Sequence, residues 1–253
     1  MKKLSLLLLV CSLLWLTPTS TQAYNENDLA AVRNGRGCPA ADLSHADLSG
    51  FDMTELDLSG ADLKNANLLG ARLEKTNLTG ANLQNANLKR AVFTEAKMAG
   101  ANLQNVTAPY TFFGGSDLTG ADLTGGNFFR GDFRGAKLDR LSAYGCNFQE
   151  TTFDKASLQN SDFSFANFSY SWLFEADVSG SLFSRANLYE IKGEGLKALK
   201  TDFYGARLGS ARLINGDFTE ANFDGAMLEN ADFKGSTLKN AVWGTAFKRN
   251  TGF

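Results

Sequence analysis

The chain has 253 residues, with 25 Lys and Arg against 27 Asp and Glu. This near-neutral balance argues against a basic nucleic-acid binder, and a hydrophobic content of 43% excludes a disordered tail. One His and three Cys provide little material for histidine-based metal sites or proton relays, so the composition favours a protein that is not an enzyme.

The first 23 residues have the pattern of an export signal. Lys2 and Lys3 precede an apolar run over residues 4–16, and Thr21-Gln22-Ala23 forms a small-residue cleavage site before Tyr24. The run is too short to span a bilayer, which takes about 20 residues. We therefore expect a signal peptide over residues 1–23 and an exported, periplasmic or secreted protein without stable membrane insertion. An uncleaved anchor is the alternative.

Residues 24–40 are predicted to form an N-terminal cap. Asn25 or Asn27 is a suitable N-cap for a short helix over residues 28–34, which Gly35 would end. We expect this helix to cover the open end of the structure that follows, because an uncovered strand edge invites aggregation.

A repeat of five residues begins at Ala41 and continues to about residue 250. Taking Leu43 as a centre, every fifth position to Trp243 gives 41 centres, of which 37 are Leu, Phe, Met, Val or Trp. The position two before each centre is small in 36 of 41 repeats, and the position before it is Asp or Asn in 23. The frame never slips, so the pattern indicates a repeat architecture.

A period of five fits neither a helix nor a simple strand, but it fits a solenoid that turns a corner every five residues. Four corners close a square coil of 20 residues, with the centre and the small residue pointing inward. Asp and Asn would lie at outward corners, where their side chains hydrogen-bond nearby backbone and tolerate unusual dihedral angles. Coils stacked about 4.8 Å apart would make a rod of about ten coils, roughly 50 Å long.

The run A-[DN]-L-x-x resembles the pentapeptide-repeat family, here as an exported bacterial member. The resemblance covers residues 41–250 and implies an all-β fold, a right-handed quadrilateral β-helix, with residues 251–253 as a tail. The resemblance also implies one possible function and one possible mode of association. Some members of the family mimic DNA and bind topoisomerases, and some form dimers through one end of the rod.

Two stretches interrupt the pattern, and two cysteines remain after the signal. Residues 190–200 lose the pattern while keeping the count, which predicts a bulged and mobile stretch, and residues 106–110 form a second weak coil. Residues 246–253 fade from the pattern and should cap the C-terminal end. Cys38 and Cys146 lie about 25 Å apart by strand spacing, too far for a disulfide, so we expect two separate thiols with Cys146 buried.

The sequence contains no catalytic, cofactor-binding or metal-binding constellation that we recognise. His45 stands alone at a predicted corner, and metal sites need three or four ligands. There is no phosphate-binding loop, no dinucleotide fingerprint and no nucleophile elbow. We therefore predict no enzymatic activity, no cofactor and no metal.

Aromatic residues away from the centre positions are the candidate functional residues. Tyr170, Trp172 and Phe174 fall on neighbouring walls of one coil, with Tyr189 one coil above Tyr170. Phe129, Phe165 and Tyr204 also lie off the centre column. Exposed aromatics gathered in this way can mark a partner site, but some could instead pack under a bulge at residues 190–200.

Three functions are compatible with these features. The first is an exported structural or protein-interaction rod, with an unknown protein partner, no nucleic-acid ligand and a homodimer contact at a rod end. The second is DNA mimicry, which needs a cytoplasmic location and a continuous acidic stripe. One outward column consists of the residues that directly precede Leu58 and the centres stacked above it. Lys97, Lys137 and Lys197 interrupt the acidic side chains of this column. The third is a carbohydrate-binding or enzymatic β-helix, for which only the region of Trp172 qualifies.

Overall fold

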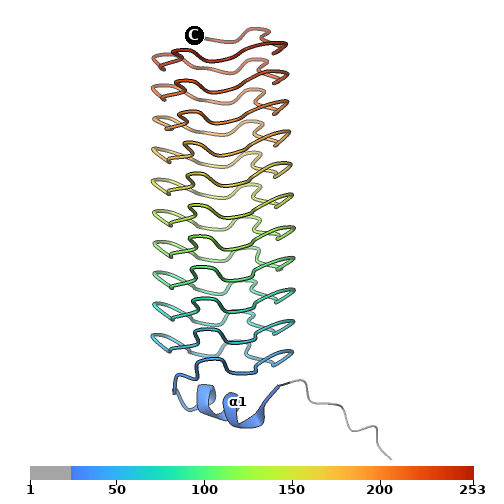
Figure 1. Cartoon of the computed structure of the whole chain (residues 1–253), viewed down its shortest axis with the longest axis vertical. Helices are drawn as coiled ribbons and strands as arrows, with labels where there is room; N and C mark the ends of the chain where they lie inside the picture. The colour runs from blue at the N-terminus through green and yellow to red at the C-terminus, as the bar shows by residue number, and fades with distance from the viewer. Residues whose placement is uncertain (1–23) are drawn as a thin grey trace, which may run out of the picture.

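The computed structural model describes residues 24–253, so the predicted signal over residues 1–23 lies outside the described residues. The chain forms one helix and a stack of similar square coils, with the helix at the N-terminal end and the C-terminus at the other (Figure 1). Among the described residues, no helix has the length and apolar character needed to cross a membrane.

Helix α1 spans Glu26–Arg33 and lies against the first coil. Asn25 is its N-cap, because the Asn25 side chain accepts the backbone N–H of Asn27 at 2.9 Å. The helix therefore begins two residues earlier than we predicted. Leu29 and Val32 are buried in the common core, and the Asp28 carboxylate accepts the backbone N–H of Asp42 at 2.9 Å. These contacts cover the N-terminal end of the stack, as the sequence led us to expect.

Each coil pairs with the next through parallel backbone hydrogen bonds in a register of 20 residues. Leu43 N–H donates to the carbonyl of Asp62, and Asp62 N–H donates to the carbonyl of Ala41, both at 2.8 Å. The same register runs from the Asp42–Asp62 bridge to the Asp232–Gly252 bridge. One residue on each side of the square forms the bridge, so the sides are too short for continuous strands.

The corners lie at the two residues after each centre. Ala46 N–H donates to the carbonyl of Leu43 at 3.1 Å, which closes a four-residue turn whose third residue, His45, has a φ of 60°. A positive φ at that position is typical of a type II turn. Our placement of Asp and Asn at the corners was therefore wrong. These residues lie at the bridge in the middle of each side, where Asp42, for example, accepts the backbone N–H of Ser44 at 3.2 Å.

The core contains the centre residues and the small residues two positions before them. Leu43, Leu83 and Phe163, for example, are fully buried. A small residue with a hydroxyl or thiol donates to the carbonyl of a centre one coil below, so the polar atom is satisfied inside the core. The residues with this contact include Thr76, Thr111, Cys146, Thr151, Ser161, Ser171, Ser181, Thr201 and Ser236.

The predicted bulge at residues 190–200 does not form. Ile191, Leu196 and Ala198 are buried, and Lys192 and Lys197 make regular bridges to the next coil. The reason is a compensation in volume, because each small centre follows a larger residue two positions earlier. The four such pairs are Val106–Ala108, Leu141–Ala143, Ile191–Gly193 and Leu196–Ala198. The side chain that the centre lacks is supplied by its neighbour, and the coil stays square.

The same compensation keeps residues 106–110 in the stack, with Val106 and Ala108 buried.

The C-terminal residues also continue the pattern instead of forming a cap. Phe247 bridges to Met227, and Gly252 bridges to Asp232. Residues assigned to a cap and tail therefore belong to the last turns of the stack.

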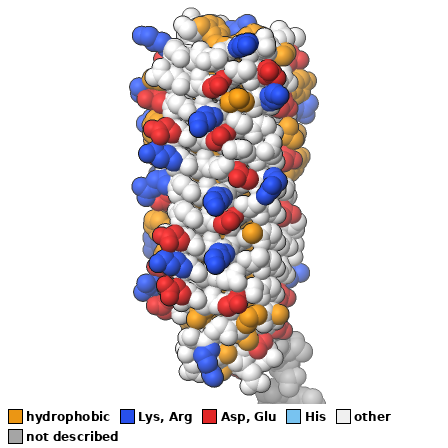
Figure 2. Space-filling view, turned by 60° about the vertical axis from the view of Figure 1, so that its left-hand side comes forward, with side chains coloured by type: hydrophobic (Ala, Val, Ile, Leu, Met, Phe, Trp, Pro, Cys, Tyr) orange, Lys and Arg blue, Asp and Glu red, His pale blue; other side chains and the backbone are white. Residues whose placement is uncertain are grey.

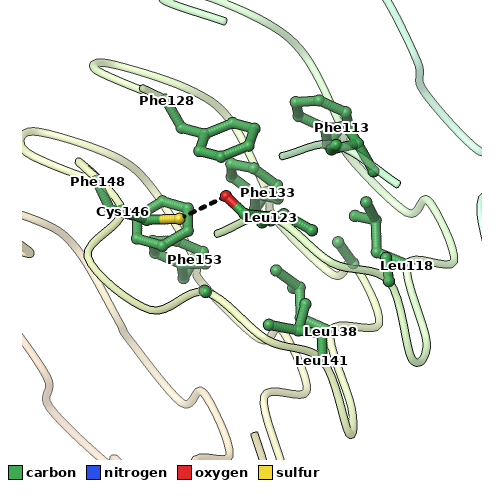
Figure 3. Close-up of a cluster of buried hydrophobic side chains, with 14 of the residues drawn as sticks. Phe113, Leu118, Leu123, Phe128, Phe133, Leu138, Leu141, Cys146, Phe148 and Phe153 are labelled. Carbon is green, nitrogen blue, oxygen red and sulfur yellow. Dashed lines mark hydrogen bonds between the residues drawn. The ribbon is translucent and has the colours of Figure 1, made fainter. Parts of the chain in front are cut away.

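Cys38 and Cys146 are both free, and Cys146 is buried, as predicted. The Cys146 thiol donates to the carbonyl of Leu123 at 2.9 Å, within a cluster of phenylalanine and leucine side chains (Figure 3). Cys38 occupies a centre position below Leu58, and its thiol lies 3.5 Å from Oδ1 of Asp28. Burial and the nearby Asp28 carboxylate raise the pKa of the Cys38 thiol.

Candidate functional site

The coil geometry places the four predicted aromatic residues on one side of the rod and its two corners. Tyr170 occupies a corner with a φ of 62°, and Trp172 forms the bridge in the middle of the next side, between Thr152 and Lys192. Phe174 lies at the far corner of that side. The five-residue spacing thus gives each side chain a fixed outward direction.

Tyr170 and Tyr189 are brought together at one corner. Their ring centroids are 5.8 Å apart at an angle of 84°, an edge-to-face arrangement, although 43% of Tyr170 and 39% of Tyr189 remain exposed. No bulge covers them, so the alternative that these rings pack under residues 190–200 is wrong.

Beside this pair is a groove of about 350 Å³. Its lining consists of Glu150, Tyr170, Trp172, Glu190 and Lys192. The Lys192 ammonium lies 5.6 Å from the centroid of the Trp172 ring, a cation–π distance. A hydrogen bond to the Glu190 carboxylate raises the pKa of the Tyr189 phenol.

Phe174 does not line this groove. It is half-buried at the other corner, where its backbone N–H donates to Oδ1 of Asp154 at 3.2 Å. Burial raises the pKa of the Asp154 carboxyl. The predicted set therefore divides into a groove with Tyr170, Trp172 and Tyr189 beside it, and a separate corner with Phe174.

Glu150, Glu190 and Lys192 are groove residues that our sequence analysis missed. The 20-residue register would have found them, because Glu150, Tyr170 and Glu190 share one corner column. Glu150 is paired with Arg130, whose Nε lies 2.7 Å from its carboxylate. We considered only aromatic residues and therefore overlooked the charged residues in the same columns.

Further aromatic residues lie at the surface of neighbouring coils. Tyr110 and Phe129 meet edge to face at 5.9 Å, and Arg130 lies 5.0 Å over the Phe129 ring. At the neighbouring corner, the ring centroids of Tyr144 and Phe165 are 5.2 Å apart. Tyr204 is 44% exposed one coil above Arg185. Ring contacts and the guanidinium groups of Arg130 and Arg185 orient the Phe129 and Phe165 rings.

This surface combines aromatic rings with single acidic and basic side chains. Within residues 24–253, no group of three or more His, Cys, Asp or Glu is arranged to hold a metal ion. His45 is exposed, and its Nε2 lies 3.0 Å from the side-chain amide of Asn65. Acidic and basic side chains alternate over the visible face of the rod, without a continuous stripe of either sign (Figure 2).

Comparisons with known proteins agree with this geometry. A family model described as pentapeptide repeats matches in eight copies, over residues 41–80, 71–107, 96–135, 136–180, 161–191 and 201–240. No curated protein sequence matches the chain.

Solved structures include similar folds. The crystal structure of HetL, a pentapeptide-repeat protein involved in heterocyst differentiation regulation in the cyanobacterium Nostoc, is 25% identical. The match covers 88% of this chain and 92% of HetL, with a TM-score of 0.50. A pentapeptide-repeat protein from the thylakoid lumen of Arabidopsis thaliana is 21% identical over 54% of this chain and 70% of its own, with a TM-score of 0.25.

Proposed function

Because the chain belongs to the pentapeptide-repeat family, whose fold is a right-handed quadrilateral β-helix, we propose that it is a non-catalytic, exported rod that binds a protein partner in the cell envelope. Members of the family are generally structural or binding proteins. The observation that carries the proposal is the position of the exposed aromatic residues. These residues occur on the coils after residue 108. On the described coils before residue 108, the exposed large hydrophobic residue is Leu69, which is not aromatic.

The side chains around the groove suit a protein partner. Tyr and Trp present large, rigid surfaces with a polar edge, and they are enriched at the energetic centres of interfaces. The rod itself would change little on binding, because successive coils are joined by regular hydrogen bonds. The partner would therefore dock on a preformed surface.

The first test is the mature N-terminus, determined by mass spectrometry of fractionated cells. The proposal expects a chain beginning at Tyr24 in the periplasm or the medium. Full-length protein in the cytosol would overturn the envelope role and favour DNA mimicry, which a gyrase supercoiling assay would then examine. The surface gives DNA mimicry little support, because even the most acidic column is interrupted by neutral residues. It begins with Asp42 and Asp62 and continues with Asn82 and Asn102.

The second test locates the partner contact. A photoreactive amino acid at position 170 should crosslink to a specific protein in intact cells. Arg90 is the matched control, because it occupies the same corner column four coils below and has a similar φ of 59°. Equal adducts from positions 90 and 170, or none from either, would count against a partner surface on the aromatic coils.

A rod end is the proposed site of a homodimer. Helix α1 covers the N-terminal end, whereas Phe247 and Phe253 at the other end are 52% and 62% exposed. Covering these rings with a second copy would bury apolar surface. Sedimentation at 500 mM NaCl, where contacts formed by exposed ion pairs are screened, should then show a dimer that Phe253→Asp dissociates. A dimer that survives this change at 500 mM NaCl would exclude the rod-end contact.

A further inference from the structure

One side of the rod carries an ordered column of charges, which we call the Lys–Asp face. It is defined by the outward bridge residues Lys97, Asp117, Lys137, Ser157, Asp177, Lys197 and Asp217. Each pairs with the next through a parallel bridge, so the seven side chains form one straight column. The spacing is about 4.8 Å, that of neighbouring strands.

The three aspartates of this face are held in place. Asp117, Asp177 and Asp217 each accept the backbone N–H of the residue two positions later, at 3.0 Å. Their carboxylates are half-exposed and keep free acceptor positions.

The three lysines are fully available. Lys97, Lys137 and Lys197 are exposed, and none of them forms an ion pair in the part of the chain that the structure describes. The ion pairs of the rod lie elsewhere, for example between Lys200 and Glu220. The face therefore presents both signs of charge outward.

The order of the charges is self-complementary. Consider a second copy that faces the first with its rod reversed, related by a two-fold axis that passes between the two Ser157 residues. Lys97 then meets Asp217, Asp117 meets Lys197, and Lys137 meets Asp177. Every charge from Lys97 to Asp217 faces its opposite, and each pair occurs twice because the interface is isologous. Asp57, two coils below Lys97 in the same column, lies outside this pairing. Two parallel rods in register would instead place like charges together.

No other side has this property. The side before the centres of the Leu43 column carries Asp42, Asp62, Asp122, Asp162 and Asp202 but no Lys or Arg, so two copies would repel each other. The next side is mainly a ladder of neutral Asn amides. On the side that contains Trp172, no register of two reversed copies forms more than one opposite-charge pair.

The edges of the Lys–Asp face permit close approach. At one corner, the two-fold axis places Gly100, Gly120 and Gly180 opposite Glu220, Lys200 and Arg140 of the other copy, so that each long side chain meets a residue without one. At the other corner, the same two-fold axis places Arg134 of one copy opposite Phe174 of the other. Arg134, which Asp132 of its own chain holds through an ion pair, would there form a cation–π pairing with the Phe174 ring.

We propose that a second copy of this chain docks antiparallel on the Lys–Asp face, side by side with the first. The contact is distinct from the rod end and does not depend on export or on the aromatic groove. Its length is about 29 Å, six rises of about 4.8 Å, and it is formed by exposed ion pairs. It is therefore a weak contact at the small end of specific interfaces, and it depends on ionic strength.

Charge exchange tests the contact. An acidic variant, K97D/K137D/K197D, and a basic variant, D117K/D177K/D217K, each introduce residues that this column already tolerates. The test is made in a Phe253→Asp background, which removes the rod-end contact. In sedimentation at low salt, each variant alone should be monomeric where the Phe253→Asp chain dimerises, and an equimolar mixture should recover the dimer. The natural dimer should weaken by about tenfold or more between 50 mM and 500 mM NaCl, where the screening length falls to a few ångströms.

The control variant K64D/K89D/R90D has the same change in net charge on other sides of the rod and should dimerise like the natural chain. A natural chain that is monomeric at low salt would overturn the proposal, as would a mixture that fails to pair. A dimer that survives in the acidic variant but not in Phe253→Asp would instead assign the association to the rod end.

Crosslinking tests the antiparallel register. In a Cys38→Ser background, Ser157→Cys should crosslink to itself through a short bis-maleimide, because this position lies on the axis. Asn77→Cys should crosslink to Thr237→Cys on a second copy but not to itself, since two copies of residue 77 would be about 38 Å apart. Self-crosslinking of Asn77→Cys without crosslinking at position 157 would exclude the register.

Discussion

The coils before residue 108 and those after it share one frame but differ inside and outside. The earlier centres are mostly leucine, as at Leu63, Leu68 and Leu83, and their surface is almost entirely polar. The later coils contain 18 of the 20 phenylalanines and most of the exposed aromatic residues. The comparison shows that the frame specifies the coil, while the side chains placed on it determine which coils have a distinct surface.

The phenylalanines form three successive ladders on different sides of the later coils. Adjacent rings within a ladder are close, as for Phe113 and Phe133 with centroids 4.7 Å apart and Phe128 and Phe148 at 5.2 Å (Figure 3). Neighbouring ladders meet edge to face, as at Phe133 and Phe148. The three ladders are residues 93–153, 128–168 and 163–223, each in steps of 20.

Volume explains why the ladders change sides. Between residues 43 and 238, four successive centres never contain more than three phenylalanines, as in Phe148, Phe153 and Phe163 with Leu158. Where Phe148 and Phe153 occupy two sides of a coil, Ala143 occupies a third. A close-packed interior of fixed cross-section limits the number of large rings at one level, so a ladder begins on a new side as another ends.

The largest expected effect comes from removing a ladder ring. Phe148→Ala should lower the free energy of unfolding by about 3–5 kcal/mol, because it leaves a cavity and removes ring contacts on both sides. Leu88→Ala, on the same side in the leucine coils, should cost about 2–5 kcal/mol. Urea denaturation of the two variants compares the regions, and a smaller loss for Phe148→Ala would show that the ladder adds nothing beyond volume.

The buried thiol of the aromatic coils should make stability depend on alkaline pH. Burial raises the pKa of Cys146 from about 9 to about 12. Between these values the unfolded chain releases a proton that the folded chain retains, so stability is lost as pH rises from 9 towards 12. In Cys146→Ala this part of the loss should disappear, while Lys and Tyr titrate alike in both proteins. Parallel stability curves for the two proteins over this range would contradict the prediction.

A smaller effect is expected where the later coils depart from the pattern. Gly193→Leu restores a large centre, but a Cβ there would lie 3.1 Å from Cδ2 of Leu213 and 3.6 Å from Leu196. Overpacking should cost about 1–3 kcal/mol. Adding Leu196→Ala should recover part of the loss, as measured by thermal unfolding. Stabilisation by Gly193→Leu alone would show that the neighbouring side chain does not fill this space.

The smallest effect should be equal in the two regions. Gly80 and Gly145 have φ values of +66° and +67°, and a Cβ at either position would meet no atom within 4 Å. Alanine at each should therefore cost about 1 kcal/mol through the backbone alone. Matching losses by urea denaturation would confine the difference between the regions to the side chains, whereas unequal losses would place part of it in the backbone.

Much of the candidate site could have been predicted from the 20-residue register. That register places Tyr170 between Glu150 and Glu190, and Trp172 below Lys192. The register also places Phe174 at the far corner of that side, but it could not show that the ring is half-buried there, because the exposure of a turn side chain depends on the side chains in the turns above and below it. The ring contact between Tyr170 and Tyr189 likewise depends on side-chain rotamers.

The sequence alone determined the square coil, the inward centres and the separation of the two thiols, because a five-residue period over 203 residues has one physical solution. Tertiary structure decided the rest. Ile191 and Leu196 could replace the missing centres only because they point into the same closed interior as Gly193 and Ala198. The compensation is a property of packed volume, which a pattern of residue types at fixed positions does not contain.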